Sequence, residues 1–422
     1  MLNRLKPKSE FSRNVLTLMT GTTIAQAIPI AISPILTRIY TPEDFGVFAL
    51  YMSVASLLSV MATGRYELAI MLPKKDEDAV NIVALSIIIA FFVSFISFLI
   101  VFIFNAQITN LLGNPEISSW LYFIPVTVLL TGIYQSLNYW SNRKKEYKRL
   151  ATSRVVQSGT TATSNLALGF TEFTSSGLIF SSILGQGIAT GILSLLIYKN
   201  NKKIFIKITK TKILFFLKKY IDFPKYSIFS DLLTTANSQL AILFLANLFS
   251  ISVVGFFSFA SRIVSVPTAI LSSSIGDVFR QEATKSYVED HECESIYVST
   301  LKKLIFLGFI PFLIIYLFSP LLFELLFGST WREGGVYASI LAPMLFLQFV
   351  SSPLSMMYYI AQKQKYYLWF IVLMFTSSIV LFLSAYIFTL NIALFLQLYS
   401  YVYGFFYLLN IAITYSLSKK RG

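Results

Sequence analysis

Arg65 and Glu67 are charged residues inside the apolar stretch Leu57–Pro73, LLSVMATGRYELAIMLP. Read as one helix, the stretch places both charges at lipid depth, where a charged side chain costs at least a few kcal/mol. Two positions correspond to about 200° around a helix, so we expect the two side chains to face different directions and to find other partners. Thr63 and Glu67 share a face. A guanidinium grips phosphate bidentately without losing its proton, which makes Arg65 a candidate phosphate anchor.

Four further charged residues fall inside or at the edges of apolar runs: Arg38, Asp231, Arg262 and Glu324. We expect Arg262 near mid-membrane, Arg38 and Glu324 near the outer surface, and Asp231 in the inner third of its helix. The interior then holds three arginines against two or three carboxylates, and this surplus favours an anionic ligand. Protonation of Asp231 or Glu67 could bias a change between conformations, so both are candidate ion-coupling residues.

The composition predicts an all-α polytopic membrane protein. The chain has 422 residues, of which 55% are hydrophobic and 13% charged, and its mean hydropathy is +0.69. Soluble globular proteins carry roughly 25% charged residues. A helix crosses the hydrocarbon core with about 20 residues. We predict about 12 transmembrane helices, at residues 14–39, 46–72, 79–104, 118–141, 151–170, 174–198, 225–248, 252–275, 302–327, 335–361, 366–388 and 391–417.

The basic residues alternate along the chain, because 30 of the 34 Lys and Arg fall at the chain ends or in every second loop. Positive charge marks the cytoplasmic side, so both termini are expected in the cytoplasm. The net charge of +14 therefore reflects topology, and no basic helix with interleaved aromatics points to nucleic acid. Single Cys293 and His291 residues exclude an internal disulfide and a multi-Cys or multi-His metal site. The first apolar segment is too long for a secretory signal and is expected to be a retained span.

The predicted helices divide into an N-terminal six-helix bundle (1–199), a cytoplasmic amphipathic linker (200–224) and a C-terminal six-helix bundle (225–422). DFGVFALYMSVAS at 44–56 resembles VVGFFSFASRIVS at 253–265, which indicates a weak internal repeat. Six spans per repeat return the chain to the same side, so the halves would be parallel repeats. A second cytoplasmic segment, 276–301, is more polar, and it forms either an interfacial helix or a solvated loop.

Polar residues at helical spacing mark the faces that turn away from lipid in the first, fourth, fifth, seventh, eighth and tenth spans. Ser and Thr are also common in helix–helix packing, which accounts for most of them. The amides favour a water-accessible cavity, so Gln26, Gln157 and Asn165 join Arg38, Arg65 and Arg262 as candidate substrate-binding residues.

Three stretches resemble a known family: TRIYTPEDFGVFALYMSVASLLSVMATGRYELAIMLPKKDEDA (37–79), FASRIVSVPTAILSSSIGDVFRQEA (259–283) and FGSTWREGGVYASILAPMLFLQFVSSPLS (327–355). The first looks like the N-terminal signature of Wzx-type O-antigen and polysaccharide-unit flippases, and the others resemble second-half motifs. These flippases belong to the multidrug/oligosaccharidyl-lipid/polysaccharide (MOP) exporter superfamily.

The resemblance implies a MATE-like fold of two six-helix bundles around a central cavity. It implies alternating access that moves an undecaprenyl-diphosphate-linked oligosaccharide to the outer leaflet of the bacterial inner membrane. It suggests H⁺ or Na⁺ coupling without a cofactor, and a polysaccharide polymerase and a chain-length regulator as partners beside membrane lipids. The cationic cavity positions of the family correspond to Arg38, Arg65 and Arg262, with Asp231 as the acidic member.

Three other functions remain open at this point. A membrane polymerase or ligase needs a catalytic periplasmic loop, but the predicted periplasmic links are short. A cation-coupled drug exporter of the same superfamily should have a more acidic and aromatic cavity. A lipid-linked peptidoglycan precursor flippase is closer in chemistry but usually carries extra C-terminal spans.

Overall fold

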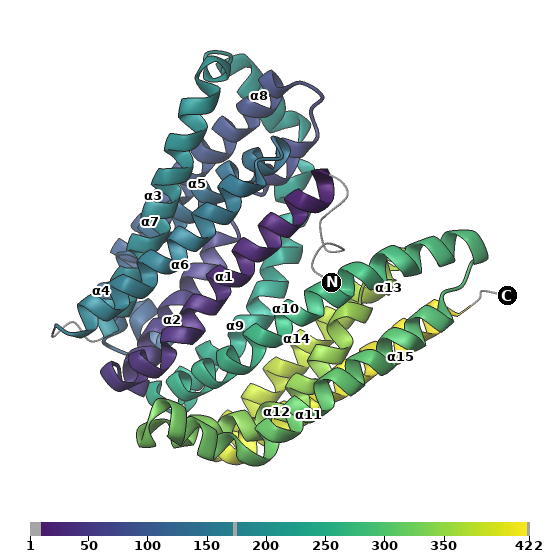
Figure 1. Cartoon of the computed structure of the whole chain (residues 1–422). Helices are drawn as coiled ribbons and strands as arrows, with labels where there is room; N and C mark the ends of the chain where they lie inside the picture. Colours follow the sequence, from purple (N-terminus) through teal and green to yellow (C-terminus); the bar gives the residue numbers. More distant parts are fainter. Residues whose placement is uncertain (1–9, 172–174, 420–422) are drawn as a thin grey trace. The chain divides into compact units, whose positions relative to one another are not determined.

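The computed structural model describes residues 10–171 and 175–419, which form helices and turns without a strand (Figure 1). The chain divides into two compact units, unit 1 (Met1–Asn247) and unit 2 (Leu248–Gly422). This boundary falls at the end of the helix Ile228–Leu248, whereas the predicted bundles meet at 200–224. The predicted bundle limits stay a prediction.

Unit 1 contains nine α-helices and two short helices of other types in its described part. They are α1 (Glu10–Ile39), α2 (Pro42–Ser59), the 3₁₀-helix η2 (Tyr66–Met71), α3 (Asp76–Leu112), α4 (Ile117–Leu121), α5 (Ile124–Arg143), α6 (Tyr147–Gly169), α7 (Ser175–Phe205), α8 (Lys210–Lys219), the π-helix η3 (Phe223–Ser227) and α9 (Ile228–Leu248).

Unit 2 contains fewer but longer helices. They are α10 (Ile251–Asp290), α11 (Glu294–Phe327), the 3₁₀-helix η4 (Ser329–Trp331), α12 (Arg332–Leu354), α13 (Met357–Ile360), α14 (Gln364–Ile387) and α15 (Ile392–Ser418). Because α10 runs to Asp290 and α11 begins at Glu294, most of the predicted cytoplasmic segment 276–301 extends these two helices.

Ten helical segments among the described residues are long and apolar enough to cross a membrane, so the chain is a multi-pass membrane protein. The predicted count of 12 is not confirmed. The predicted spans 46–72 and 151–170 have no counterpart among the ten, although α2 and α6 occupy these places. Helix α2 has only 18 residues and α6 carries many polar side chains, so neither is a typical apolar span.

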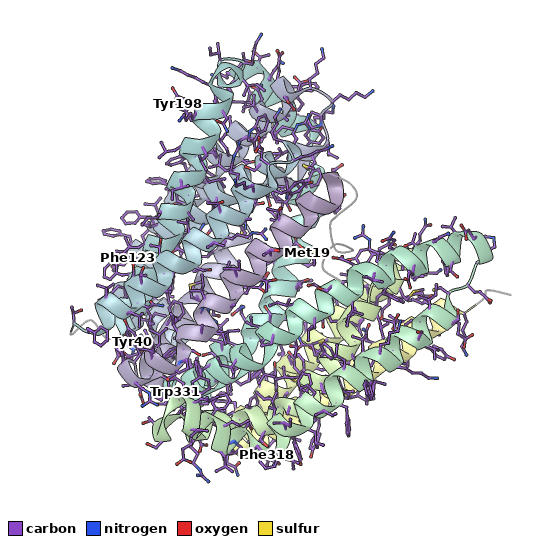
Figure 2. The ribbon with its side chains drawn as sticks, in the orientation of Figure 1. Met19, Tyr40, Phe123, Tyr198, Phe318 and Trp331 are labelled. Carbon is purple, nitrogen blue, oxygen red and sulfur yellow. The ribbon has the colours of Figure 1, made fainter. Side chains whose placement is uncertain are left out.

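Many large apolar side chains project from the helices, as expected where lipid is the solvent. Met19, Tyr198 and Phe318, labelled in Figure 2, are 42%, 54% and 49% exposed. Where two helices pack closely against each other, a glycine lets their backbones approach. A Cβ at Gly21 would lie 2.4 Å from the Ala151 Cβ, so α1 and α6 pack with their backbones close together, as small residues allow in membrane helices.

Helix α8 packs against the rest of unit 1 through both its apolar and its basic side chains. Phe216 packs into a buried cluster that includes Tyr66 and Trp140. The Tyr66 hydroxyl donates to the Leu217 carbonyl at 2.8 Å. The Lys212 ammonium lies 2.7 Å from Asp78 Oδ1, and this hydrogen bond raises the pKa of Lys212. The linker predicted from the sequence thus contributes a helix that is anchored to unit 1.

Candidate functional site

The chain between α2 and α3 leaves the helical path. Helix α2 starts with a capping box in which Thr41 and Asp44 satisfy each other's backbone N–H groups, and it ends at Ser59. Gly64 and Arg65 both have φ of 61°, in the left-handed region, and η2 follows. Glycine adopts this conformation without a steric penalty. The predicted continuous helix over 46–72 is therefore wrong.

This turn brings Arg65 and Glu67 together. Arg65 Nη1 lies 3.4 Å from Glu67 Oε1, although helical geometry predicted that the two side chains would face different directions. That prediction fails because residue 65 is left-handed and residue 67 lies in a 3₁₀ turn. The Thr63 hydroxyl donates a hydrogen bond to Glu67 Oε2. The carboxylate is 1% exposed and is satisfied by both neighbours.

Asp231 completes the cluster from α9. Its Oδ2 lies 2.8 Å from Arg65 Nη2, and the Asp231 side chain is 40% exposed, whereas that of Arg65 is 18% exposed. We call Arg65, Glu67 and Asp231 the charge cluster. It places one guanidinium between a buried carboxylate and an accessible one. Removal of the guanidinium would leave Glu67 buried without a counter-charge, which is strongly unfavourable.

The Arg65 side chain keeps one unused donor. Its Nε atom is buried and has no hydrogen-bond partner among the described residues. The Tyr139 phenol lies within electrostatic range of all three charges. With two carboxylates around one guanidinium, the ionised cluster carries one net negative charge, so an anion can bind Arg65 only after a carboxylate is displaced or neutralised.

A second polar region of unit 1 follows one face of α6. Arg154 Nη1 donates to the Thr22 hydroxyl of α1 at 2.6 Å. Gln157 donates to the Gln186 side chain of α7, and Gln186 Nε2 is buried without a partner. Asn165 is half-buried, and its Oδ1 is also buried without a partner among the described residues. The structure therefore packs Gln157 against α7 and leaves Asn165 with an unused acceptor, and their role in substrate binding stays a prediction.

Arg154 is a functional candidate that the charge pattern concealed. It belongs to a run of basic residues, Arg143–Arg154, that resembles a charged loop, but it lies in the second turn of α6. Arg154, Gln157, Thr161 and Asn165 follow the spacing i, i+3, i+7 and i+11, so they share one helix face. This spacing could have identified Arg154 as the inner end of the polar face.

The remaining predicted residues are not brought into the charge cluster. Gln26 and Arg38 of α1 are exposed, and neither forms a hydrogen bond or ion pair with another described residue. Arg262 lies in α10 of unit 2, is also exposed, and forms no such contact within the described part of the chain. Glu324 pairs with Arg332 at 2.6 Å.

Unit 2 contains a hydrogen-bond network of uncharged side chains within its largely apolar interior. Asn410 Nδ2 donates to the Ser351 and Ser355 hydroxyls at 2.6 and 2.8 Å, and its Oδ1 accepts from the Tyr358 hydroxyl at 2.9 Å. All four side chains belong to unit 2, and we call them the neutral network. Among the residues that the structure describes, no group of three or more His, Cys, Asp and Glu side chains could hold a metal ion.

Comparison with protein families now identifies the class. Residues 35–336 match the model of a family described as polysaccharide biosynthesis protein, which covers most of the chain. The chain belongs to this polysaccharide biosynthesis family. The matched range includes the charge cluster and all of α10. No curated protein matches the chain in sequence.

Solved structures show the fold of this polysaccharide biosynthesis family member. It resembles the lipid II flippase MurJ in an inward closed conformation, with 14% identity, a TM-score of 0.68 and coverage of 97% of this chain and 88% of that chain. It also resembles an inward-facing multidrug MATE transporter of the MOP superfamily, with 15% identity, a TM-score of 0.61 and coverage of 95% of this chain and 93% of that chain. A MOP superfamily transporter from Pyrococcus furiosus has 14% identity and a TM-score of 0.58, with coverage of 96% of this chain and 94% of that chain. The predicted MATE-like, all-α fold is confirmed for the part of the chain that the structure describes.

Proposed function

We propose that the protein flips a diphosphate-lipid-linked oligosaccharide, such as an O-antigen or related polysaccharide repeat unit, from the cytoplasmic to the periplasmic leaflet of the bacterial inner membrane. Both termini lie in the cytoplasm in this proposal. The observation that carries it is the position of Arg65, whose guanidinium is held by the accessible carboxylate of Asp231 in a chain of the polysaccharide biosynthesis family.

The lipid diphosphate replaces Asp231 on Arg65. Arg65 Nη2 is already 2.8 Å from a carboxylate oxygen, and a phosphate oxygen forms the same charge-assisted hydrogen bond. Glu67 stays buried, so it holds the guanidinium in place during the exchange. Because Asp231 is 40% exposed, its release into water carries a small cost compared with the release of a buried carboxylate.

The other candidate residues contribute further contacts to the diphosphate and to the sugars. Arg262 and Arg38 supply further positive charge for the diphosphate, and Gln26, Gln157 and Asn165 donate and accept hydrogen bonds with sugar hydroxyls. The lipid tail stays in the bilayer while the head group crosses. The substrate is moved chemically unchanged, so no covalent step is required. A polysaccharide polymerase and a chain-length regulator use the product on the periplasmic side.

Coupling to an ion follows from the same exchange. When the phosphate takes Arg65, the released Asp231 carboxylate becomes free to bind H⁺ or Na⁺. Occupation of Asp231 by either ion then favours the substrate-bound cluster. Glu67 is the second candidate, but its burial and its bond from Thr63 make it the less accessible of the two.

The test is complementation of a flippase-null bacterial strain, read as surface polysaccharide at equal expression. Arg65→Ala should abolish the polysaccharide, and Arg65→Lys should restore only part of it because an ammonium cannot bind phosphate bidentately. Arg332→Ala is the matched control, since it removes an exposed arginine from an ion pair at 2.6 Å outside the cluster. Full surface polysaccharide from both Arg65→Ala and Arg262→Ala would overturn these roles.

Reconstituted protein separates this function from its neighbours in the superfamily. Proteoliposomes should flip a diphosphate lipid that carries an oligosaccharide more rapidly than one that carries a peptidoglycan precursor, and they should not export a cationic dye. The opposite order of preference would replace the proposed substrate with one of the other two.

A further inference from the structure

A groove in unit 2 runs between α10 and α12 and has a volume of about 380 Å³. Its wall on α10 extends from Ser265 to Asp277, and its opposite wall extends from Leu345 in α12 to Met356, two residues past the end of α12. We call it the α10/α12 groove. The volume lies within the range of small-molecule sites, roughly 300–1,000 Å³. Twelve residues of helix span about 18 Å, so the groove suits an elongated ligand.

The helices are held at the base of the groove by a proline-dependent contact. Pro353 has no N–H group, so the Phe349 carbonyl one turn earlier loses its helical donor. The Ser272 hydroxyl donates to this carbonyl at 3.3 Å. One turn further, a Cβ at Gly276 would lie 3.6 Å from Pro353, so the helices stay in close contact. The groove is therefore a built feature of α10 and α12.

The groove offers polar groups that have no partner within the described chain. Gln348, Ser352 and Asp277 are exposed and Ser265 is half-buried, and none of their side chains forms a hydrogen bond or ion pair with another described residue. Thr268 and Ser273 donate to carbonyls of their own helix, which leaves their oxygen atoms as acceptors. The open groups thus combine donors and acceptors along the length of the groove.

The charge of the lining does not favour phosphate. No lysine or arginine lines the groove, and Asp277 adds a negative charge at one end. Apolar side chains such as Leu345, Phe349 and Met356 complete the walls. Sugars present hydroxyl groups on their rims and C–H groups on their faces. An amide, several hydroxyls and one carboxylate beside apolar surface therefore match an uncharged or amino-sugar glycan.

We propose that the α10/α12 groove binds the uncharged glycan of the lipid-linked substrate and selects substrates by glycan length. The inference rests on the proposed function, and it divides the recognition work. Arginines bind the diphosphate in the proposed function, whereas this groove, with its length of about 18 Å, suits a glycan of several sugars. Gln348 and Ser352 on α12 and Ser265 on α10 are the specificity-determining residues.

The experiment compares two defined probes in proteoliposomes. One is a polyprenyl diphosphate that carries a neutral trisaccharide, and the other carries a single sugar; flipping is read as accessibility to a membrane-impermeant lectin. The variant Gln348→Leu/Ser352→Ala should slow the trisaccharide lipid roughly five- to tenfold, as expected for the loss of one or two hydrogen bonds. It should leave the single-sugar lipid unchanged. Gln397→Leu on α15 is the matched control because Gln397 is also exposed but lies outside the groove.

Equal slowing of both lipids, or no slowing of either, would overturn the groove as a glycan site. Binding of the free neutral trisaccharide to purified protein provides a readout that does not depend on flipping. Wild-type protein should bind it, and the groove variant should bind it more weakly by a similar factor. If the wild type flips neither lipid, the proposed function fails, and the binding comparison still decides whether the groove holds glycan.

Discussion

Helices α2 and α10 begin with similar sequences and then diverge. The stretch 44–56 in α2 resembles 253–265 in α10, yet α2 ends at Ser59 and α10 continues to Asp290. In unit 1 the chain leaves the helical path at Gly64 and Arg65. The arginine that follows the first stretch, Arg65, is held by two carboxylates, whereas the arginine inside the second stretch, Arg262, has no partner among the described residues.

The two units accommodate an arginine in different ways. Arg65 adopts a left-handed conformation just before the 3₁₀-helix η2, where Thr63 and Glu67 lie at short range, and α9 adds Asp231. Arg262 is carried by an uninterrupted helix, where nearby positions provide only Ser and apolar residues. Unit 1 therefore depends on ion pairing, whereas the interior network of unit 2 consists of neutral groups.

The largest expected effect is on Arg65. Arg65→Met should lower the free energy of unfolding by about 3–5 kcal/mol, because it leaves Glu67 buried without a cation. Arg262→Met should change it by less than about 0.5 kcal/mol, since Arg262 has no partner to strand. Thermal unfolding in detergent measures both. The double variant Arg65→Met/Glu67→Gln should recover most of the loss, and a failure to recover would show that Glu67 is not the stranded group.

The neutral network should give the next largest effect. Asn410→Leu leaves the Ser351, Ser355 and Tyr358 hydroxyls without their shared partner, and we expect a loss of about 2–3 kcal/mol. The loss should be the same at neutral and mildly acidic pH because none of these groups titrates there. Unfolding measured at both pH values checks this, and a loss present only at one of them would contradict the comparison.

Replacement of Arg154 tests whether its hydrogen bond from α6 to α1 also stabilises unit 1. Arg154→Met removes the hydrogen bond to Thr22, which should cost about 1.5 kcal/mol. Thr22→Val removes the same bond from the other side. The double variant should cost little more than either single variant, and unfolding of all three forms a double-mutant cycle. Fully additive losses would mean that the bond does not contribute.

Two glycines sharpen the contrast between the broken and the continuous helix. Gly64→Ala should destabilise the protein by about 1 kcal/mol, because φ is +61° and the new Cβ would lie 3.2 Å from the Tyr66 ring. Gly276→Ala in α10 should stabilise it by about 0.5 kcal/mol, because the nearest atoms are at an ordinary 3.6 Å and helical alanine restricts the unfolded chain. Unfolding midpoints with the same sign for both variants would contradict this contrast.

The smallest effect concerns Cys293, which joins α10 to α11. Burial raises the pKa of this thiol to about 11. A group whose pKa is raised by folding contributes stability below its ordinary value, and the contribution is lost as pH rises toward the folded pKa. Wild-type stability should thus fall more steeply above about pH 9 than that of Cys293→Ala. Parallel pH profiles of the unfolding midpoint would show that the thiol is accessible.

The sequence predicted the helical membrane fold because apolar runs of about 20 residues identify spans directly. It misplaced the chain near Arg65 because a left-handed turn at Gly64 and Arg65 leaves no break in hydropathy. The pairing of Asp231 with Arg65 depends on packing between α9 and the turn, which helical spacing alone does not encode. Arg154 was missed because its charge resembled that of neighbouring loop cations, although its spacing to Gln157 placed it on the polar face.

The central claim is that a lipid diphosphate replaces Asp231 on Arg65, and the most direct test is binding of an oligosaccharide-diphosphate lipid to purified protein. Asp231→Asn should bind the lipid more tightly than wild type, because Arg65 Nη2 then has no carboxylate to release before it binds phosphate. Equal affinity of wild type and Asp231→Asn would contradict the exchange.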